Sequence, residues 1–391
     1  MNKKIVFVFA VACLLAFTLK VKLDARKQLD AAKAHLEKNL VDYTDVTRFP
    51  RNTAPDGKLR AIPSNDWTSG FYSGNLWYMY EYTKDKKWEE AARKWTAGLE
   101  KEKFNTRTHD LGFMLYCSFG NGYRLTNDPA YKEIMIQGAK SLSTRFNAKT
   151  GTIRSWDHGK WQFPVIIDNM MNLELLFWAT KVTGDSSFYK VAVTHANTTM
   201  KNHFRADNSS YHVVDYDTIT GKVVARVTHQ GYADESAWAR GQAWGLYGYT
   251  VAYRETRDQK YLDLAVKIAD FYLNHPHLPK DKVPYWDFNA PAIPNEERDA
   301  SAAAIAASGM LELSRYVRNG QPFKKAAEDI LISLSSDAYL AKAGTNNNFV
   351  LKHSVGHKPA KSEIDTPLVY ADYYYIEALL RYDRMSKSNT K

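Results

Sequence analysis

Five short segments with one shared pattern decide the fold. They are Asp85-Lys86-Lys87-Trp88, Asp128-Pro129-Ala130-Tyr131, Asp185-Ser186-Ser187-Phe188, Asp258-Gln259-Lys260-Tyr261 and Gly320-Gln321-Pro322-Phe323. In each, an Asp or Gly stands three residues before an aromatic residue, and an alanine follows at helical spacing in most of them, as Ala92 and Ala192 do. Aspartate is a favoured helix N-cap, and the aromatic residue and alanine form one buried stripe. Each segment therefore predicts the start of an amphipathic helix.

A second set of helical stretches, richer in Trp, Tyr, Gly and Ala, alternates with the first set. These stretches are Leu76–Tyr82, Leu111–Arg124, Asn169–Val182, Trp238–Glu255, Ala302–Val317 and Val369–Met385. Their composition is typical of helices buried on nearly all sides. The amphipathic stretch Asp24–Leu40 supplies a sixth partner, so six hairpins can close on themselves. The pattern predicts an all-α protein, an (α/α)6 toroid of six inner and six outer helices.

Long irregular stretches separate the hairpins and indicate where function is built. They are residues 41–75, 147–164, 205–235, 276–299 and 344–367. The third contains two strand-like segments, Ser210–Val214 and Lys222–Thr228, which predict a small β-hairpin at one rim. No linker rich in Pro, Gly or Ser interrupts the chain, so residues 21–391 are expected to form a single catalytic domain.

The first 20 residues have the order of an export signal, with Lys3 and Lys4 before an apolar run that ends at Leu19. We therefore predict a signal peptide and a periplasmic protein. An uncleaved membrane anchor, or a lipid attached at Cys13, is the alternative. Because Cys117 is the only other cysteine, the mature domain cannot form an internal disulfide.

The formal charge of +10 favours an anionic partner, which could be a nucleic acid, a membrane surface or an acidic glycan. No nucleic-acid-binding motif is present, so we predict no nucleic-acid partner. The sequence also lacks metal-ligand spacings, a nucleophile elbow and a phosphate-binding glycine loop, which predicts neither a metal nor a cofactor. An acidic glycan remains the partner that fits best.

Two aspartates stand where inner helices begin. Asp110 precedes Leu111, and Asp168 precedes Asn169, so neighbouring helices would bring both carboxylates to one end of the ring. Cleaving a sugar acetal or hydrating an enol ether requires a proton donor and a base near one atom, and two carboxylates in unlike environments supply both. The alternative is that each aspartate only caps its helix.

Polar and aromatic neighbours favour the catalytic interpretation. His109 precedes one carboxylate and Asn169 follows the other. Arg240 and Trp244 lie four residues apart on one helical face, where a guanidinium could hold a carboxylate while an indole stacks on a sugar ring. An ion pair inside the bundle is the alternative for Arg240, and core packing is the alternative for Trp238 and Trp244.

The sequence resembles the unsaturated glucuronyl hydrolases of glycoside hydrolase family 88, with the unsaturated rhamnogalacturonyl hydrolases as a related group. The resemblance rests on six segments in order along the chain: Trp67-Thr-Ser-Gly-Phe71, His109-Asp-Leu-Gly-Phe113, Asp168-Asn-Met-Met-Asn-Leu173, His229-Gln-Gly231, Trp238-Ala-Arg-Gly-Gln-Ala-Trp244 and Ser354-Val-Gly-His-Lys358. The family's fold is the same (α/α)6 toroid. Its substrates are oligosaccharides whose non-reducing uronate carries a C4=C5 double bond made by a lyase.

The resemblance implies the reaction and the roles of individual residues. The vinyl ether is hydrated, with Asp168 as general acid and base and Asp110 as the second carboxylate, whose charge would raise the pKa of Asp168. The residues that match the uronate pocket are Trp67, Trp156, His212, Gln230, Trp238, Arg240 and Trp244. Those that match a loop meeting the following sugar, where sulfate can be read, are Ser354, His357 and Lys358. Sulfated fragments of glycosaminoglycans or of ulvan would suit this loop.

Two other classes of function remain open from the residues alone. A polysaccharide lyase or an inverting glycosidase could use the same toroid, the first with a Tyr or His base beside an arginine and the second with two carboxylates about 6.5 to 9.5 Å apart. A non-catalytic glycan-binding toroid would keep the aromatic residues and Arg240 without needing Asp168.

Overall fold

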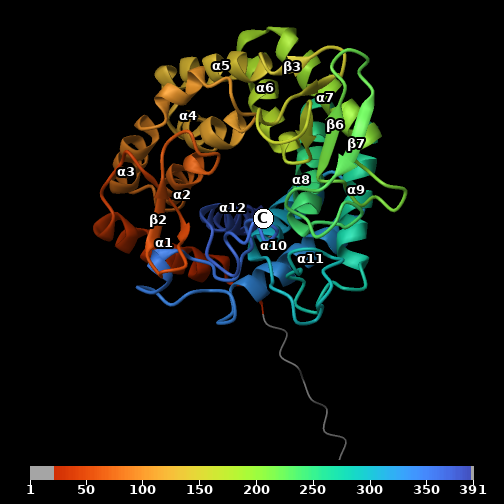
Figure 1. The fold of residues 1–391 in the computed structure, drawn as a ribbon. Helices are drawn as coiled ribbons and strands as arrows, with labels where there is room; N and C mark the ends of the chain where they lie inside the picture. The colour runs from red at the N-terminus through yellow and green to blue at the C-terminus, as the bar shows by residue number, and fades with distance from the viewer. Residues whose placement is uncertain (1–21, 389–391) are drawn as a thin grey trace, which may run out of the picture.

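The computed structural model describes residues 22–388, which form paired helices arranged around a central opening (Figure 1). The inner helices are α2 (Ser69–Thr83), the pair η2 (Gly112–Gly120) and α4 (Asn121–Thr126), α6 (Asn169–Thr183), α8 (Ala239–Thr256), α10 (Ala300–Leu313) and α12 (Val369–Ser388). The outer helices are α1 (Ala25–Asp42), α3 (Lys86–Ala97), α5 (Pro129–Ser143), α7 (Ser186–Asn202), α9 (Gln259–Asn274) and α11 (Gln321–Leu334).

The inner helices contact one another in chain order, and the ring closes where the last meets the first. Helix α2 packs on η2, η2 on α6, α6 on α8, α8 on α10, α10 on α12, and α12 on α2. Helix α1 packs on α12 and so completes the outer layer. The predicted (α/α)6 toroid is confirmed.

The predicted capping pattern explains four of the outer helices directly. The side chains of Asp85, Asp128, Asp185 and Asp258 each accept a hydrogen bond from a backbone amide two residues ahead. Helix α11 differs, because Gly320 has no side chain to cap it. A Cβ atom at Gly320 would lie 1.8 Å from the carbonyl oxygen of Ser314, so tight packing excludes an aspartate there.

The inner helices are buried on all sides, as their composition indicates. Every residue of α10 is buried, and so is every residue of α8 from Ala239 to Ala252. Each inner helix touches two inner neighbours and an outer partner, so it has no solvent-facing stripe. The polar side chains on these helices therefore bond within the protein or face the central opening.

Small sheets and two short helical segments occupy the rim. Strands β1 (Phe49–Thr53) and β2 (Leu59–Ile62) pair, as do β3 (Phe146–Asn147) and β4 (Thr152–Ile153). Strands β6 (Val213–Tyr216) and β7 (Val223–Val227) form the predicted hairpin, with the first strand beginning three residues later and ending two residues later than predicted. Strand β5 (Pro164–Ile166) pairs with β6 and makes a third strand that the sequence did not reveal. The segments η1 (Glu100–Phe104) and η3 (Asn346–Asn348) complete the elements.

Three sequence expectations concern the chain outside or beside the ring. The predicted export segment, residues 1–20, lies outside the described residues. Within residues 22–388, no helix is both long and apolar enough to span a membrane. Cys117 is a free thiol buried in η2.

The second and third inner helices approach each other most closely at Gly112. A Cβ atom added there would lie 2.5 Å from the Cα atom of Asn172 on α6, so the contact requires glycine. The amide of Phe113, in the first turn of its helix, donates a hydrogen bond of 2.8 Å to the Oδ1 atom of Asn172. Asp110 and Asp168 lie within about one turn of this contact, so it sets their relative positions.

We predict that Gly112→Ala separates the two helices and destabilises the protein by roughly 1–3 kcal/mol, the usual cost of overpacking. Urea unfolding followed by circular dichroism measures this change. Gly245→Ala on inner helix α8 is the matched control, because its Cβ atom would meet Phe204 at an ordinary 3.4 Å. Equal stability of the two variants would show that the close approach at Gly112 does not constrain the ring.

Candidate active site

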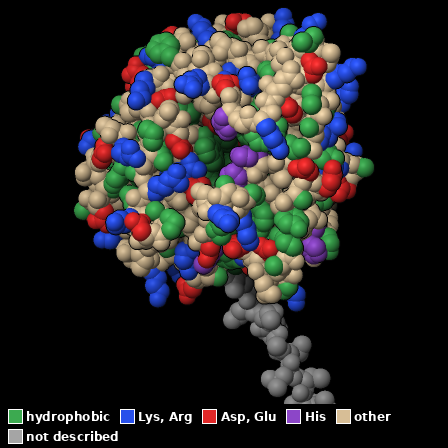
Figure 2. Space-filling view, viewed as in Figure 1, with side chains coloured by type: hydrophobic (Ala, Val, Ile, Leu, Met, Phe, Trp, Pro, Cys, Tyr) green, Lys and Arg blue, Asp and Glu red, His purple; other side chains and the backbone are tan. Residues whose placement is uncertain are grey.

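A cavity of about 410 Å³ opens at the end of the ring where the inner helices begin. Figure 2 shows a hollow at the centre of this face, with histidine side chains on its wall. Eight residues predicted from the sequence line the cavity: Trp67, His109, Asp110, Trp156, Asp168, Gln230, Arg240 and His357. The two carboxylates, far apart in the chain, therefore share one cavity.

Asp168 is a buried carboxyl group that does not cap its helix. It occupies the N-cap position of α6 but forms no capping hydrogen bond, and its side chain is 9% exposed. Burial raises the pKa of Asp168 to about 7; Arg240 opposes this rise, and the negative charge of Asp110 adds to it. At neutral pH a large fraction of this side chain carries a proton, as a general acid requires.

Asp110 is held by its two neighbours in the chain. Its Oδ2 atom accepts a hydrogen bond of 2.7 Å from the Thr108 hydroxyl, and its Oδ1 atom lies 3.2 Å from Nε2 of His109. The other ring nitrogen of His109 lies 2.9 Å from the Ser155 carbonyl oxygen, to which it can only donate. Nε2 of the neutral ring therefore carries no proton, and it has no hydrogen-bond partner. Burial lowers the pKa of His109, and the charge of Asp110 opposes that fall.

His212, the residue immediately before strand β6, faces Asp168. Its Nδ1 atom accepts hydrogen bonds of 3.0 Å from the amides of His229 and Gln230, so the proton of the neutral ring is on Nε2. That nitrogen lies 3.8 Å from Oδ2 of Asp168, and neither atom has a hydrogen-bond partner. Burial lowers the pKa of His212. The neutral Nε2–H donor of His212 and the Oδ2 atom of Asp168 therefore both remain available to a bound substrate.

Arg240 is buried and fixed in position, and it also lines the cavity. Its guanidinium group donates to Oδ2 of Asp299 at 3.1 Å and to the Gly356 carbonyl at 2.7 Å. It donates to the Val355 carbonyl as well. The ion pair with Asp299 is the structural role considered from the sequence, and the same geometry holds a positive charge against the cavity wall.

The predicted tryptophans divide into two groups. Trp67 and Trp156 line the cavity, and the Trp67 ring packs 4.9 Å from the ring of Tyr370. Trp238 is buried between His212 and Arg240, while Trp244 is fully buried against Phe113. Neither Trp238 nor Trp244 lines the cavity, but the Trp244 side chain acts on the Asp168 carboxyl from behind the wall and lowers its pKa.

Three predicted residues lie away from the cavity wall. Asn169 is fully buried and donates from Nδ2 to the Ile153 carbonyl at 2.9 Å. Ser354 is fully buried, and its backbone pairs with Thr366. Lys358 forms ion pairs with Glu296, at 2.5 Å, and with Glu297. The structure thus does not bring these side chains to the two carboxylates.

Several cavity residues were not predicted. Arg51 bonds both Glu363, at 2.5 Å, and Asp66, at 2.7 Å, and joins two rim loops that are far apart in the chain. Exposed Arg107 and buried Tyr370 also line the cavity. These residues stand in irregular stretches or at a helix start without a recognisable motif. No group of three or more His, Cys, Asp or Glu side chains in residues 22–388 is arranged to hold a metal ion.

Comparisons with known proteins agree with this geometry. The family description "Glycosyl Hydrolase Family 88" matches residues 41–383. An unsaturated glucuronyl hydrolase of Formosa agariphila is 50% identical over 361 residues, covering 91% of this chain and 90% of the relative.

Two solved structures are also similar. A crystal structure of an unsaturated glucuronyl hydrolase specific for heparin is 54% identical, with a TM-score of 0.91, over 93% of this chain and 98% of the other. A Streptococcus agalactiae unsaturated glucuronyl hydrolase variant in complex with dGlcA-GalNAc6S is 31% identical, with a TM-score of 0.80, over 98% of both chains.

The toroid with two carboxylates in one cavity defines the molecule as a carbohydrate-active hydrolase. The chain belongs to glycoside hydrolase family 88. The prediction of an unsaturated glucuronyl hydrolase is thereby confirmed, and its substrate is an oligosaccharide.

We predict that Asp110→Asn lowers the pKa of Asp168 below its value of about 7, because the substitution removes a negative charge that opposes ionisation. The carboxyl carbon of Asp168, assigned by its loss in Asp168→Asn, reports the pKa in a ¹³C NMR titration. Asp66→Asn is the control, since Asp66 lines the cavity but is neutralised by Arg51. An unchanged or higher pKa in Asp110→Asn would contradict the coupling.

Proposed function

We propose that this glycoside hydrolase removes the 4,5-unsaturated uronyl residue by hydrating its vinyl ether, with Asp168 as the proton donor. The observation that carries the proposal is a buried carboxyl group with a pKa of about 7, beside a second carboxylate in one cavity. A pKa near the working pH suits a group that both gives and takes a proton. The cavity volume of about 410 Å³ is within the usual range for small-molecule sites.

The proposed reaction adds one water molecule. Protonated Asp168 gives its proton to C4, and positive charge develops on C5 and the ring oxygen. Water adds to C5 and loses a proton to the Asp168 carboxylate, which restores the acid. The resulting hemiketal opens, and the next sugar leaves. Negative charge on Asp110 favours the protonated form of Asp168 before the proton is transferred. The same charge stabilises the cationic transition state.

The alternative chemistries have less support. A lyase would need a Tyr or His base beside an arginine, and Tyr370 is the tyrosine next to Arg240, with ring and guanidinium 5.4 Å apart. Burial raises the pKa of Tyr370 above its ordinary value of 10, which makes it harder to deprotonate. Burying Asp168 costs desolvation free energy, and no capping hydrogen bond to α6 offsets that cost. A non-catalytic glycan binder would have no reason to keep an aspartate there. The unsaturated rhamnogalacturonyl hydrolase alternative is disfavoured by the relatives.

We predict that Asp168→Asn lowers kcat at least about a thousandfold, because the amide is nearly isosteric but cannot deliver a proton. Loss of the near-ultraviolet absorbance of a lyase-made unsaturated disaccharide measures the rate. Asp185→Asn is the matched control on the same helical hairpin, because Asn caps a helix as well as Asp does. Full activity of Asp168→Asn, or equal loss in both variants, would refute the role of Asp168.

We further propose that the substrate is a sulfated glycosaminoglycan fragment and that Arg107 contributes to reading its sulfate. Arg107 lines the cavity, is exposed and forms no ion pair with a described residue. Lys358, which the sequence resemblance favoured for this role, is engaged by Glu296 and Glu297. The carboxylate that Arg107 interacts with, Asp157, is already paired with Arg145 and Arg154. A sulfate group would therefore gain more from Arg107 than from an ammonium group that has two carboxylates of its own.

We predict that Arg107→Ser raises KM for a sulfated unsaturated disaccharide about three- to tenfold more than for its unsulfated counterpart. Added salt should weaken binding of the sulfated disaccharide more than binding of the unsulfated one, because salt screens charge contacts. Steady-state kinetics with both disaccharides test this, and Lys358→Met serves as the comparison, with less than about a twofold effect expected. A larger selective effect of Lys358→Met would assign sulfate recognition to its loop instead.

A further inference from the structure

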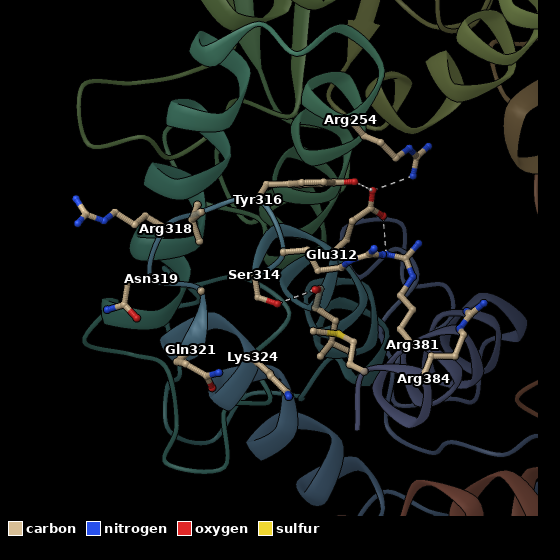
Figure 3. A pocket seen from close by; sticks show the side chains of 15 residues that line it. Arg254, Glu312, Ser314, Tyr316, Arg318, Asn319, Gln321, Lys324, Arg381 and Arg384 are labelled. Carbon is tan, nitrogen blue, oxygen red and sulfur yellow. Dashed lines mark hydrogen bonds and ion pairs between the residues drawn. The ribbon is translucent and has the colours of Figure 1, made fainter. Parts of the chain in front are cut away.

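A second large cavity lies at the opposite end of the ring from Asp110 and Asp168. This rear cavity has a volume of about 790 Å³ and is formed by the ends of α8, α10 and α12, the start of α11, and the turn between α10 and α11. Figure 3 shows Arg318 and Asn319 on one side of it, Arg381 and Arg384 on the other, and Gln321 and Lys324 between them.

The rear cavity is separate from the catalytic cavity. Arg240 and Arg254 stand fourteen residues apart on α8, and the first lines the catalytic cavity while the second lines the rear cavity. At 1.5 Å per residue this separation is about 21 Å. Aromatic side chains fill the toroid between its two ends. The centroid of Trp244 lies 5.1 Å from that of Phe113 and 5.3 Å from that of Tyr374. A small ligand in one cavity therefore does not reach the other.

The innermost cations of the rear cavity are already neutralised. Arg254 pairs with Glu312 at 2.9 Å and with Glu255 at 2.8 Å, and it also pairs with Glu174. Arg381 pairs with Glu312 at 2.7 Å. These buried groups form the floor of the cavity and have no charge to spare for a ligand.

The outer wall carries positive charge without compensation. Arg315, Arg318 and Lys324 line the rear cavity, and none of them forms an ion pair with a described residue. Both arginines are exposed, and the lysine is half-buried. The exposed amide side chains of Asn319 and Gln321 stand beside them and can bond to hydroxyl groups.

Other features of the wall suit a sugar chain better than a single small anion. Val317 and Met385, which line the cavity and are partly exposed, give it an apolar surface on which the C–H face of a pyranose ring can pack. A lone sulfate or phosphate ion would fill only a small part of 790 Å³. The uncapped start of α11 adds a weak positive potential to the larger potential of the three cations.

We propose that the rear cavity is a second binding site, which takes a sulfated or carboxylated oligosaccharide. Three uncompensated cations, neutral amide donors and an apolar face match a chain of anionic, hydroxyl-bearing rings. The choice of a sugar over other polyanions rests on the proposed function, since that function places the enzyme among fragments of such chains. The site would hold the enzyme on a longer anionic chain while the catalytic cavity remains open to short unsaturated ends.

The test uses a heparin octasaccharide made with nitrous acid, which carries no C4=C5 double bond. Fluorescence anisotropy of the labelled octasaccharide measures its binding to three proteins that all carry Asp168→Asn: the otherwise unchanged chain and two triple variants. Excess unsaturated disaccharide occupies the catalytic cavity of each protein. The rear variant is Arg315→Ser, Arg318→Ser, Lys324→Ser. The control is Lys190→Ser, Lys201→Ser, Lys267→Ser, which removes the same charge from exposed lysines on outer helices.

We expect the rear variant to bind the octasaccharide about tenfold or more weakly and the control less than about twofold more weakly. With Asp168 restored, both variants should turn over the unsaturated disaccharide within twofold of the wild-type rate. Failure of that turnover in the wild-type protein would refute the proposed function and leave the binding result unaffected.

Four outcomes would overturn the second site. Equal weakening in both variants would indicate general attraction to a basic protein, and no weakening in the rear variant would exclude the cavity. If low concentrations of inorganic sulfate displace the octasaccharide, the cavity is a site for a single anion. If sulfate displaces it no better than sodium chloride at equal ionic strength, the result supports a site for a sugar chain. Preferential binding of anionic phospholipid vesicles through the same three cations would assign the surface to a membrane.

Discussion

The catalytic arrangement depends on the close approach of η2 and α6 at Gly112. Two carboxylates from different helices can share a cavity only if those helices keep one fixed separation and register. The missing side chain at Gly112 sets the separation, and the bond from the Phe113 amide to Asn172 sets the register. Both constraints lie inside the ring, about one turn below the reacting groups.

The same burial that fixes the geometry also adjusts the acid. Asp168 lies on a helix start but forms no bond to the helix amides, so its charged form gains little there to offset the loss of water. Nearby positive charge on Arg240 prevents a larger rise of its pKa. The Arg240 guanidinium is in turn held by Asp299 at the start of α10 and by the carbonyl of Gly356. Residues at the starts of α6, α8 and α10, Asp110 just before η2 and one rim loop thus together determine the protonation of a single side chain.

The helices were predictable because their causes are local. An aspartate cap, an aromatic residue and an alanine within one short segment suffice to start an outer helix, and Asp85 and Asp258 behave as expected. The pairing of β5 with β6 and the bridge from Arg51 to Glu363 join segments far apart in the chain, so no local pattern reveals them. Trp238 and Trp244 match the family motif, yet only packing shows that they lie behind the cavity wall.

Closure of the ring has a consequence for synthesis of the chain. Helix α12 is synthesised after the other described helices, yet it contacts both α10 and α2 and carries Tyr370 to the catalytic cavity. Until it docks, the apolar flanks of α2 and α10 have no inner partner and the outer helix α1 lacks its main support. The ring therefore stays open, with apolar helix surface exposed, until α12 has been synthesised and has docked.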